Sequence, residues 1–161
     1  IYSKIILIFR EQIIENMKNI VLPVDFAESN DKLIDGAIQF AKEVNARICL
    51  IHVAPLDIGF AIGDMGFQYF PEVEQNEIKG ELAQLHQLEQ LIISQGVPCE
   101  HLLRQGSAKE LILEYAEEKE AAFIVMGSHG RSGMYDVFVG SLTKDLTKNS
   151  PIPVLVIPCH K

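Results

Sequence analysis

Five short apolar runs divide the chain at intervals that suit the strands of one sheet. Most are rich in Val, Ile and Leu, and polar residues, Gly or Pro follow them. Runs of this length and composition are typical of strands buried on both faces of a parallel sheet. The five predicted strands cover residues 20–24, 47–53, 98–104, 121–126 and 154–157.

The segments between these runs carry apolar residues at helical spacing. Residues 31–44 and 72–95 each predict an amphipathic helix, and Gly96 is placed to end the second. Ser107 and Glu110 have the spacing of a capping box that opens a third helix, and 140–149 contains a short fourth one. The apolar positions of the first two helices are Leu33, Ile34, Ala37, Ile38, Ala41, Val44, Ile78, Leu82, Leu85, Leu88, Leu91 and Ile92.

Alternating strands and helices predict right-handed β-α-β units, hence a five-stranded parallel sheet with helices on both faces. We expect the strand order 3-2-1-4-5, in which strands one and four are neighbours. Ligands of such sheets bind outside the carboxyl ends of the strands where the order reverses. Asp25 ends strand one and Gly127 ends strand four, so both are expected at one site.

A long connection over residues 55–71 carries four aromatic residues and three glycines. Connections of this length in a compact domain are usually functional or mobile. It either forms a lid or a surface for a partner, or packs on its own domain.

The composition excludes several classes of protein. The chain has 161 residues and a formal net charge of −8, which disfavours binding to nucleic acid or an anionic membrane. No apolar run approaches the ~18 residues that span a bilayer. Three cysteines, far apart and without a C-x-x-C pair, indicate buried thiols in a reducing cytoplasm.

Residues 1–16 are expected to be a non-native or flexible N-terminal extension. Met17 directly precedes the first strand, and the chain begins with Ile1. The alternative is an amphipathic helix that packs on the domain. We therefore place the domain at residues 17–161.

A glycine-rich segment follows the fourth strand and is the strongest indication of chemistry. Gly127 and Gly130 are followed, after nine residues, by Gly140 and Ser141 at the start of a helix. Glycine allows close approach of the backbone to a ligand, and a helix start offers unpaired N–H groups to an anion. With the hydroxyls of Ser141 and Thr143, the segment predicts a phosphate site.

Other residues near this site permit more than one interpretation. Asp25 either contacts a ribose or amino group, holds Mg²⁺, or caps the next helix. Val53 either packs on a ligand ring or is simply core. His129 and Arg131 either reach a phosphate or face solvent.

Catalytic motifs are missing from the sequence. There is no G-x-x-x-x-G-K-[ST] loop, no G-x-G-x-x-G after the first strand and no G-x-S-x-G elbow. His52 reads as a core residue. The histidines show no metal-ligand spacing with one another, namely His52, His86, His101 and His160.

Taken together, these residues resemble the ATP-binding branch of the universal stress protein family. The resemblance runs from about Lys18 to Pro158. It rests on I-V-L-P-V-D at 20–25, I-H-V at 51–53, M-G-S-H-G-R-S-G at 126–133 and G-S-L-T at 140–143, with the spacing G-x₂-G-x₉-G-[S/T].

The resemblance implies a nucleotide site, ATP with Mg²⁺ or Mn²⁺ at the phosphates, and a homodimer that pairs the last strands through Val154, Leu155 and Val156. Leu142 stands where the family often has valine, but a backbone contact is expected there. The implied nucleotide-binding residues are Pro23, Val24, Asp25, Val53, Met126, Gly127, His129, Gly130, Arg131, Gly140, Ser141, Leu142 and Thr143.

Three functions follow from this reading. The first is a nucleotide-dependent regulatory module of the stress response, with an unknown protein partner, and we favour it because no general base is evident. The second is a slow ATPase or phosphotransferase that uses the same site. The third is a nucleotide-free dimeric scaffold.

Overall fold

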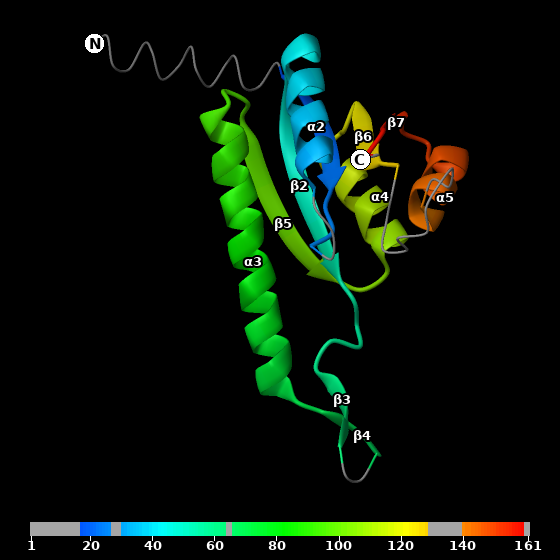
Figure 1. The fold of residues 1–161 in the computed structure, drawn as a ribbon. Helices are drawn as coiled ribbons and strands as arrows, with labels where there is room; N and C mark the ends of the chain where they lie inside the picture. The colour runs from blue at the N-terminus through cyan, green and yellow to red at the C-terminus, as the bar shows by residue number, and fades with distance from the viewer. Residues whose placement is uncertain (1–16, 27–29, 64–65, 129–139, 160–161) are drawn as a thin grey trace.

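A five-stranded parallel sheet forms the centre of the molecule (Figure 1). The computed structural model describes residues 17–26, 30–63, 66–128 and 140–159. The sheet has the order β5-β2-β1-β6-β7. Numbered along the chain, that is the predicted order 3-2-1-4-5. The strands are β1 Lys18–Pro23, β2 Ala46–Ala54, β5 Cys99–Gln105, β6 Phe123–Gly127 and β7 Val154–Ile157.

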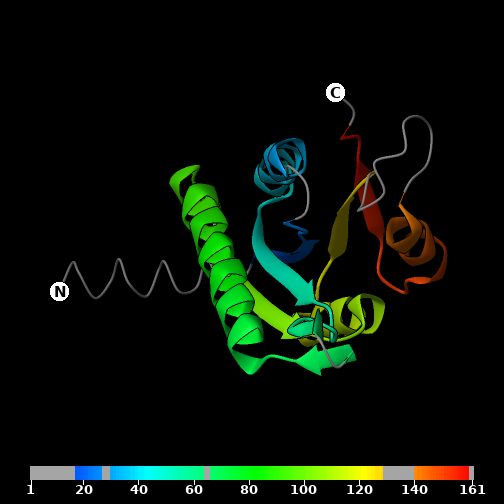
Figure 2. The same cartoon turned by 60° about the horizontal axis from the view of Figure 1, so that its bottom comes forward.

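Two helices cover each face of the sheet (Figures 1 and 2). Helices α2 (Asp31–Val44) and α3 (Pro71–Ser94) lie on one face, and α4 (Ala108–Glu118) and α5 (Ser141–Asn149) on the other. Among the described helices, none combines the length and hydrophobicity that a membrane span requires.

The side-chain alternation of the strands creates two separate cores. In β1, Ile20 and Leu22 pack toward α2 and α3, whereas Val21 packs toward α4 and α5. All three side chains are fully buried. A central strand buried on both faces reads as a continuous apolar run rather than an alternating one, which is why the sequence pattern of this strand is reliable.

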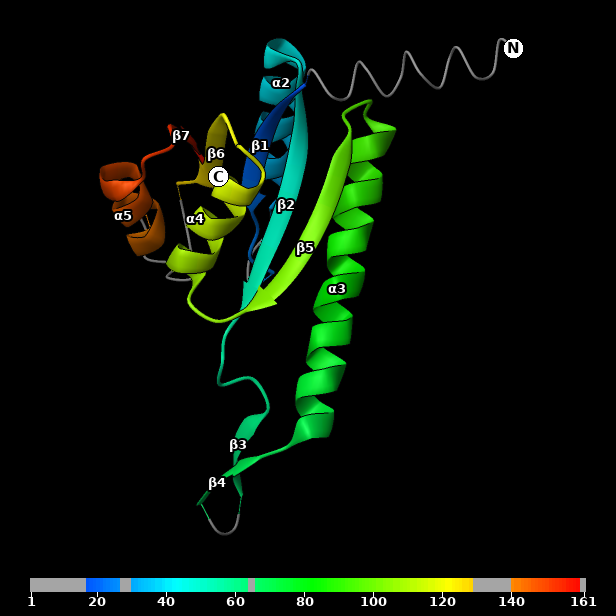
Figure 3. The same cartoon turned by 180° about the vertical axis from the view of Figure 1, so that it is seen from behind.

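The connection 55–71 contains a small antiparallel hairpin that the sequence analysis did not predict. Strands β3 (Phe60–Gly63) and β4 (Gly66–Tyr69) pair with each other only. The Phe60 and Tyr69 rings lie 5.0 Å apart. The hairpin lies beyond the carboxyl end of the sheet, beside the first turns of α3 (Figure 3). Apolar side chains around it are exposed, namely Leu56, Phe60, Tyr69, Phe70 and Val73.

Two further expectations need correction. The predicted apolar stripe of α3 is too wide: Leu85 and Ile92 are fully buried, but Leu82 and Leu91 are 44% and 47% exposed. Leu82 and Leu91 instead border two surface hollows beside α3. Ser107 occupies the N-cap position of α4 as predicted, yet its side chain makes no capping hydrogen bond.

Two glycines inside helices lie in contrasting surroundings, and this generates a stability prediction. A Cβ at Gly80 in α3 would meet open space, whereas one at Gly36 in α2 would lie 2.8 Å and 2.9 Å from Ile157 side-chain atoms. Gly80→Ala should therefore stabilise the fold by about 0.5–1 kcal/mol. Gly36→Ala should have a free energy of unfolding about 1–3 kcal/mol lower than that of Gly80→Ala, because the new methyl group overpacks the α2–β7 contact.

Urea unfolding of both variants measures this difference. Equal free energies of unfolding for the two variants would contradict the packing of α2 against β7.

Candidate functional site

The central strands β1 and β6 are hydrogen-bonded neighbours, as the sequence predicted, and they part before their carboxyl ends. Their pairing stops at Val21↔Ile124, whereas β1 remains paired with β2 as far as Pro23↔Ile51. The Val24 N–H donates to the Ile51 carbonyl at 2.9 Å. Main-chain groups of successive residues alternate between the two neighbours of a strand, so those of Pro23 point toward β6. Another residue would donate an N–H to β6 at this position, but proline has none. Proline thus interrupts the ladder at the predicted ligand site.

The chain segment that leaves β1 is held by side-chain bonds to its main chain. The Asn30 amide donates to the Asp25 carbonyl at 2.7 Å. Asn30 occupies the N-cap position of α2, although its side chain does not cap the helix. The residue at the N-cap of α2 is thus Asn30, and the interpretations of Asp25 stay predictions. The Asp25 residue is half-buried.

His52 connects the same segment to α3. Its Nδ1 lies 2.8 Å from the Val24 carbonyl oxygen, and because a carbonyl only accepts, Nδ1 carries the proton. On the other side, Nε2 lies 3.4 Å from a carboxylate oxygen of Glu81 and has no hydrogen-bond partner among the described residues. The ring is 4% exposed. His52 is a core residue, as expected, but only one of its nitrogens is satisfied.

The two ends of the glycine-rich segment lie together at the end of β6. The Gly140 N–H donates to the Ser128 carbonyl at 3.1 Å. Ser128 is buried and also bonds to β7 and the residues after it: its N–H donates to Ile157, and its hydroxyl accepts from the Cys159 N–H at 2.9 Å. Ser128 was missed in the sequence analysis, because a serine inside a glycine-rich loop gives no signal for such a role.

The bond between Ser128 and Gly140 closes the neck of the glycine-rich segment, and helix α5 begins directly after this neck. Gly140 is its N-cap residue and makes no side-chain capping bond, and no acidic residue lies in the first turn. Among the described residues, neither a side-chain cap nor an acidic first-turn residue competes for the first N–H groups of α5, and the helix dipole favours an anion there. Ser141, the first residue of α5, is exposed.

Thr143 was expected to offer its hydroxyl to a phosphate, but the structure uses the hydroxyl proton within the protein. Its hydroxyl donates to the Gly127 carbonyl at 3.0 Å, and the residue is 4% exposed. The bond joins the first turn of α5 to the end of β6. The hydroxyl oxygen retains acceptor capacity but its proton is used.

The remaining predicted residues lie either in one of the two cores or outside the described residues. Met126 is 5% exposed, and Val53 and Leu142 pack around the same core on the α4 and α5 face. Val24 is 6% exposed and belongs to the other core. His129, Gly130 and Arg131 lie outside the described residues, so their roles stay predictions.

The thiols of Cys49 and Cys99 are not activated as nucleophiles. Burial raises the pKa of the Cys49 thiol to about 12, and burial together with the Glu89 carboxylate also raises the pKa of Cys99. A nucleophilic thiol requires the opposite shift. All three cysteines are free.

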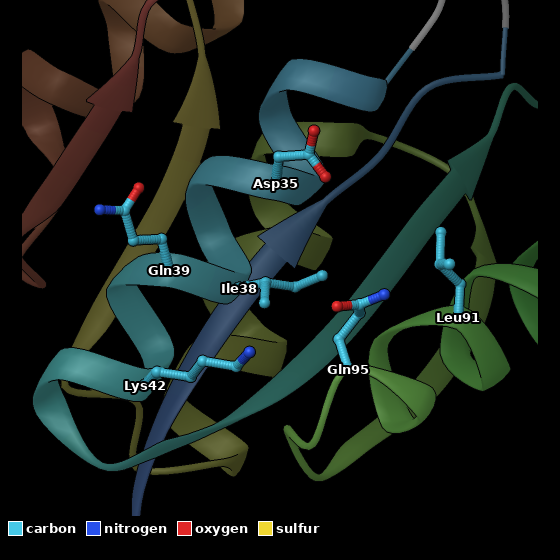
Figure 4. A pocket seen from close by; sticks show the side chains of 6 residues that line it. All are labelled: Asp35, Ile38, Gln39, Lys42, Leu91 and Gln95. Carbon is cyan, nitrogen blue, oxygen red and sulfur yellow. The ribbon is translucent and has the colours of Figure 1, made fainter.

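A surface hollow elsewhere does not have the character of a site. It lies between α2 and α3, with a volume of about 340 Å³. Figure 4 shows Ile38 and Lys42 on α2 pointing toward Gln95 near the end of α3. No catalytic cluster or unpartnered buried polar atom lines it, so we place the candidate site at the carboxyl ends of β1 and β6.

The model of the universal stress protein family matches residues 16–158. The chain belongs to the universal stress protein family. The match covers the five strands of the sheet and the helices that pack on it, so the earlier resemblance to this family is confirmed.

Individual relatives agree with this assignment. Universal stress protein MJ0531 of Methanocaldococcus jannaschii is 31% identical over 147 residues, which cover 89% of this chain and 84% of the relative. The solved structure of MJ0577, from the same organism, is 25% identical with a TM-score of 0.68, and the match covers 89% of this chain and 97% of that one. A universal stress protein of Archaeoglobus fulgidus, solved in complex with dAMP, shares the fold at 20% identity, with a TM-score of 0.60 and coverage of 87% and 97%.

The Thr143 bond generates a prediction for this universal stress protein. Thr143→Val should lower the free energy of unfolding by about 1–3 kcal/mol, because it leaves the Gly127 carbonyl without its partner. Thr143→Ser keeps the hydroxyl and is the matched control. Chemical denaturation of both variants measures the effect, and a valine variant as stable as the serine variant would show that the bond is not needed.

Proposed function

We propose that this universal stress protein binds an adenine nucleotide, ATP with Mg²⁺ or Mn²⁺, at the carboxyl ends of β1 and β6. The binding serves a regulatory role in which nucleotide occupancy alters the surface presented to a partner. The observation that carries the proposal is the closed neck from Ser128 to Gly140, which joins the end of β6 to the N-terminus of α5 beside the end of β1.

Each part of the nucleotide has a chemically suitable neighbour at this place. The phosphates would lie on the glycine-rich segment and the first N–H groups of α5. The Asp25 carboxylate follows β1 and suits ribose hydroxyls as an acceptor. Pro23 and Val53 are half-buried and offer apolar surface for the base, whereas Val24, buried in the other core, would contribute its main chain. The Archaeoglobus fulgidus relative that was solved with dAMP supports an adenine nucleotide.

Binding without turnover fits the described residues better than catalysis. Burial raises the pKa of the Cys49 and Cys99 thiols, so neither thiol is activated as a nucleophile. A cytoplasmic location stays our prediction, and the three free cysteines support a reducing compartment.

Titration calorimetry with ATP and Mg²⁺ tests the nucleotide site. We expect one ATP per chain. Asp25→Asn should weaken binding about 10-fold or more, since a hydrogen bond to a charged group contributes about 1.5–3 kcal/mol. Gly130→Val should weaken it further by obstructing the phosphates.

Asp35→Asn is the matched control, because it removes one exposed carboxylate from α2 and leaves the site intact. Absence of ATP binding in the wild type, or an equal loss in the control, would overturn the proposal. ATP recovered intact after prolonged incubation with the protein supports a binding module. ATP lost in wild type but retained with Asp25→Asn would support the slow ATPase instead.

We also propose a homodimer through the outer edge of β7, which ends the sheet. The carbonyls of Pro153 and Ile157 accept bonds from β6 at 2.9 Å. By alternation, the main-chain groups of Val154 and Val156 point toward the open edge. Such an edge is disposed to pair with a second strand.

Val156→Pro removes one outward N–H and should convert the dimer into a monomer. Val156→Ala keeps that N–H and should remain a dimer. Light scattering after size exclusion measures both, and a dimer that survives Val156→Pro would place the interface elsewhere.

A further inference from the structure

Two histidines and a glutamate that are separated in sequence converge where α3 packs on β5. The Nδ1 atom of His86 lies 3.3 Å from the Oε2 atom of Glu89, and the Nδ1 atom of His101 lies 3.0 Å from the same oxygen. The two imidazole rings meet edge to face at 5.8 Å. One ligand atom from each of the three residues lies within 4.8 Å of the others.

The fold explains why these three side chains meet. His86 and Glu89 are three residues apart on α3, so they lie on the same side of the helix. Leu85 and Ile92 of α3 are fully buried and hold that part of the helix against the sheet. His101 lies between Cys99 and Leu103 on β5, and these two pack into the same core as α3.

An ordinary ion pair leaves this cluster incompletely satisfied. Both rings approach a single carboxylate oxygen, and the buried Nδ1 of His101 has no hydrogen-bond partner among the described residues, despite its 3.0 Å distance from Glu89. The distance is short enough for a hydrogen bond, but the Glu89 oxygen lies outside the direction in which Nδ1 could form one. An unpartnered buried nitrogen is costly unless something else occupies its lone pair.

The distances match those between ligands of one metal ion. Atoms bound at about 2.0–2.1 Å in tetrahedral geometry are separated from each other by about 3.3 Å. Two imidazole nitrogens and a carboxylate favour zinc or a similar transition metal over Mg²⁺ or Ca²⁺, which prefer oxygen ligands. The geometry points to a Zn²⁺ site formed by His86, Glu89 and His101.

Three protein ligands leave the fourth position of such an ion open. The His86 side chain is 61% exposed, whereas those of Glu89 and His101 are 16% and 20% exposed. The site is therefore open to solvent on the His86 side. A hollow of about 350 Å³ adjoins His101 and is otherwise lined by Ile78, Leu82, Leu102 and Leu103.

This site is separate from the proposed nucleotide site. His101 lies on β5, an edge strand, and β2 intervenes between it and β1. A bound ion would join α3 to β5 and so stabilise the fold, because binding to the native state alone raises stability. It does not depend on nucleotide binding.

Titration of the metal-free full chain with Zn²⁺ tests the proposal by calorimetry and by thermal unfolding. We expect one Zn²⁺ per chain and a higher Tm when it is bound. His86→Ala should weaken binding at least tenfold, since changes even to the partners of metal ligands typically reduce affinity about 10–100-fold. His86 is exposed, so this variant should fold.

Glu89→Gln should weaken binding in the same direction, and Glu77→Gln, an exposed change elsewhere on α3, should not. Affinity should fall as the pH is lowered, because protons compete for the imidazole nitrogens. A wild type without Zn²⁺ affinity would overturn the proposal. So would an unchanged affinity in both His86→Ala and Glu89→Gln, since the ion would then bind adventitiously at other residues.

Discussion

The missing N–H of Pro23 is the constraint on which the candidate site depends. Strand β1 lies between β2 and β6, and it remains paired with β2 to its last residue while its ladder with β6 stops two residues earlier. A residue with an N–H at this position would allow the ladder to continue. Proline separates the two central strands at their carboxyl ends, where the order of the sheet reverses and where Asp25 and the glycine-rich segment emerge.

Hydrogen bonds from side chains hold the main chain on both sides of the point where β1 and β6 separate. On the β1 side, His52 and Asn30 bond to the main-chain carbonyls of Val24 and Asp25. On the β6 side, Ser128 and Thr143 fix the neck of the glycine-rich segment and the start of α5. These bonds position main-chain atoms at the ends of β1 and β6 and at the start of α5. A site built in this way suits binding, for which rigid donors are sufficient.

The sequence predicted the sheet well because its strands are buried on both faces. Apolar runs such as 20–24 and 121–126 are typical of strands buried on both faces of a sheet, and the alternation with amphipathic helices restricts the topology. The candidate site followed from that topology, because Asp25 and Gly127 each end one of two neighbouring strands.

The roles of Ser128 and Asn30 could not be predicted, since they depend on hydrogen bonds whose partners are set by the folded backbone. The hairpin was missed because β3 and β4 are short, rich in glycine and paired only with each other. The approach of His86 to His101 was missed because it joins a helix to a strand and leaves no regular spacing in the sequence.

Backbone amide NMR during titration with ATP and Mg²⁺ tests the central claim most directly, because it reports where the ligand binds as well as whether it binds. The largest changes should occur at residues 24–25, 127–128 and 140–142, the ends of β1 and β6 and the start of α5. Changes centred on the hollow between α2 and α3, or none at saturating ATP, would show that the parting of β1 from β6 does not form the nucleotide site.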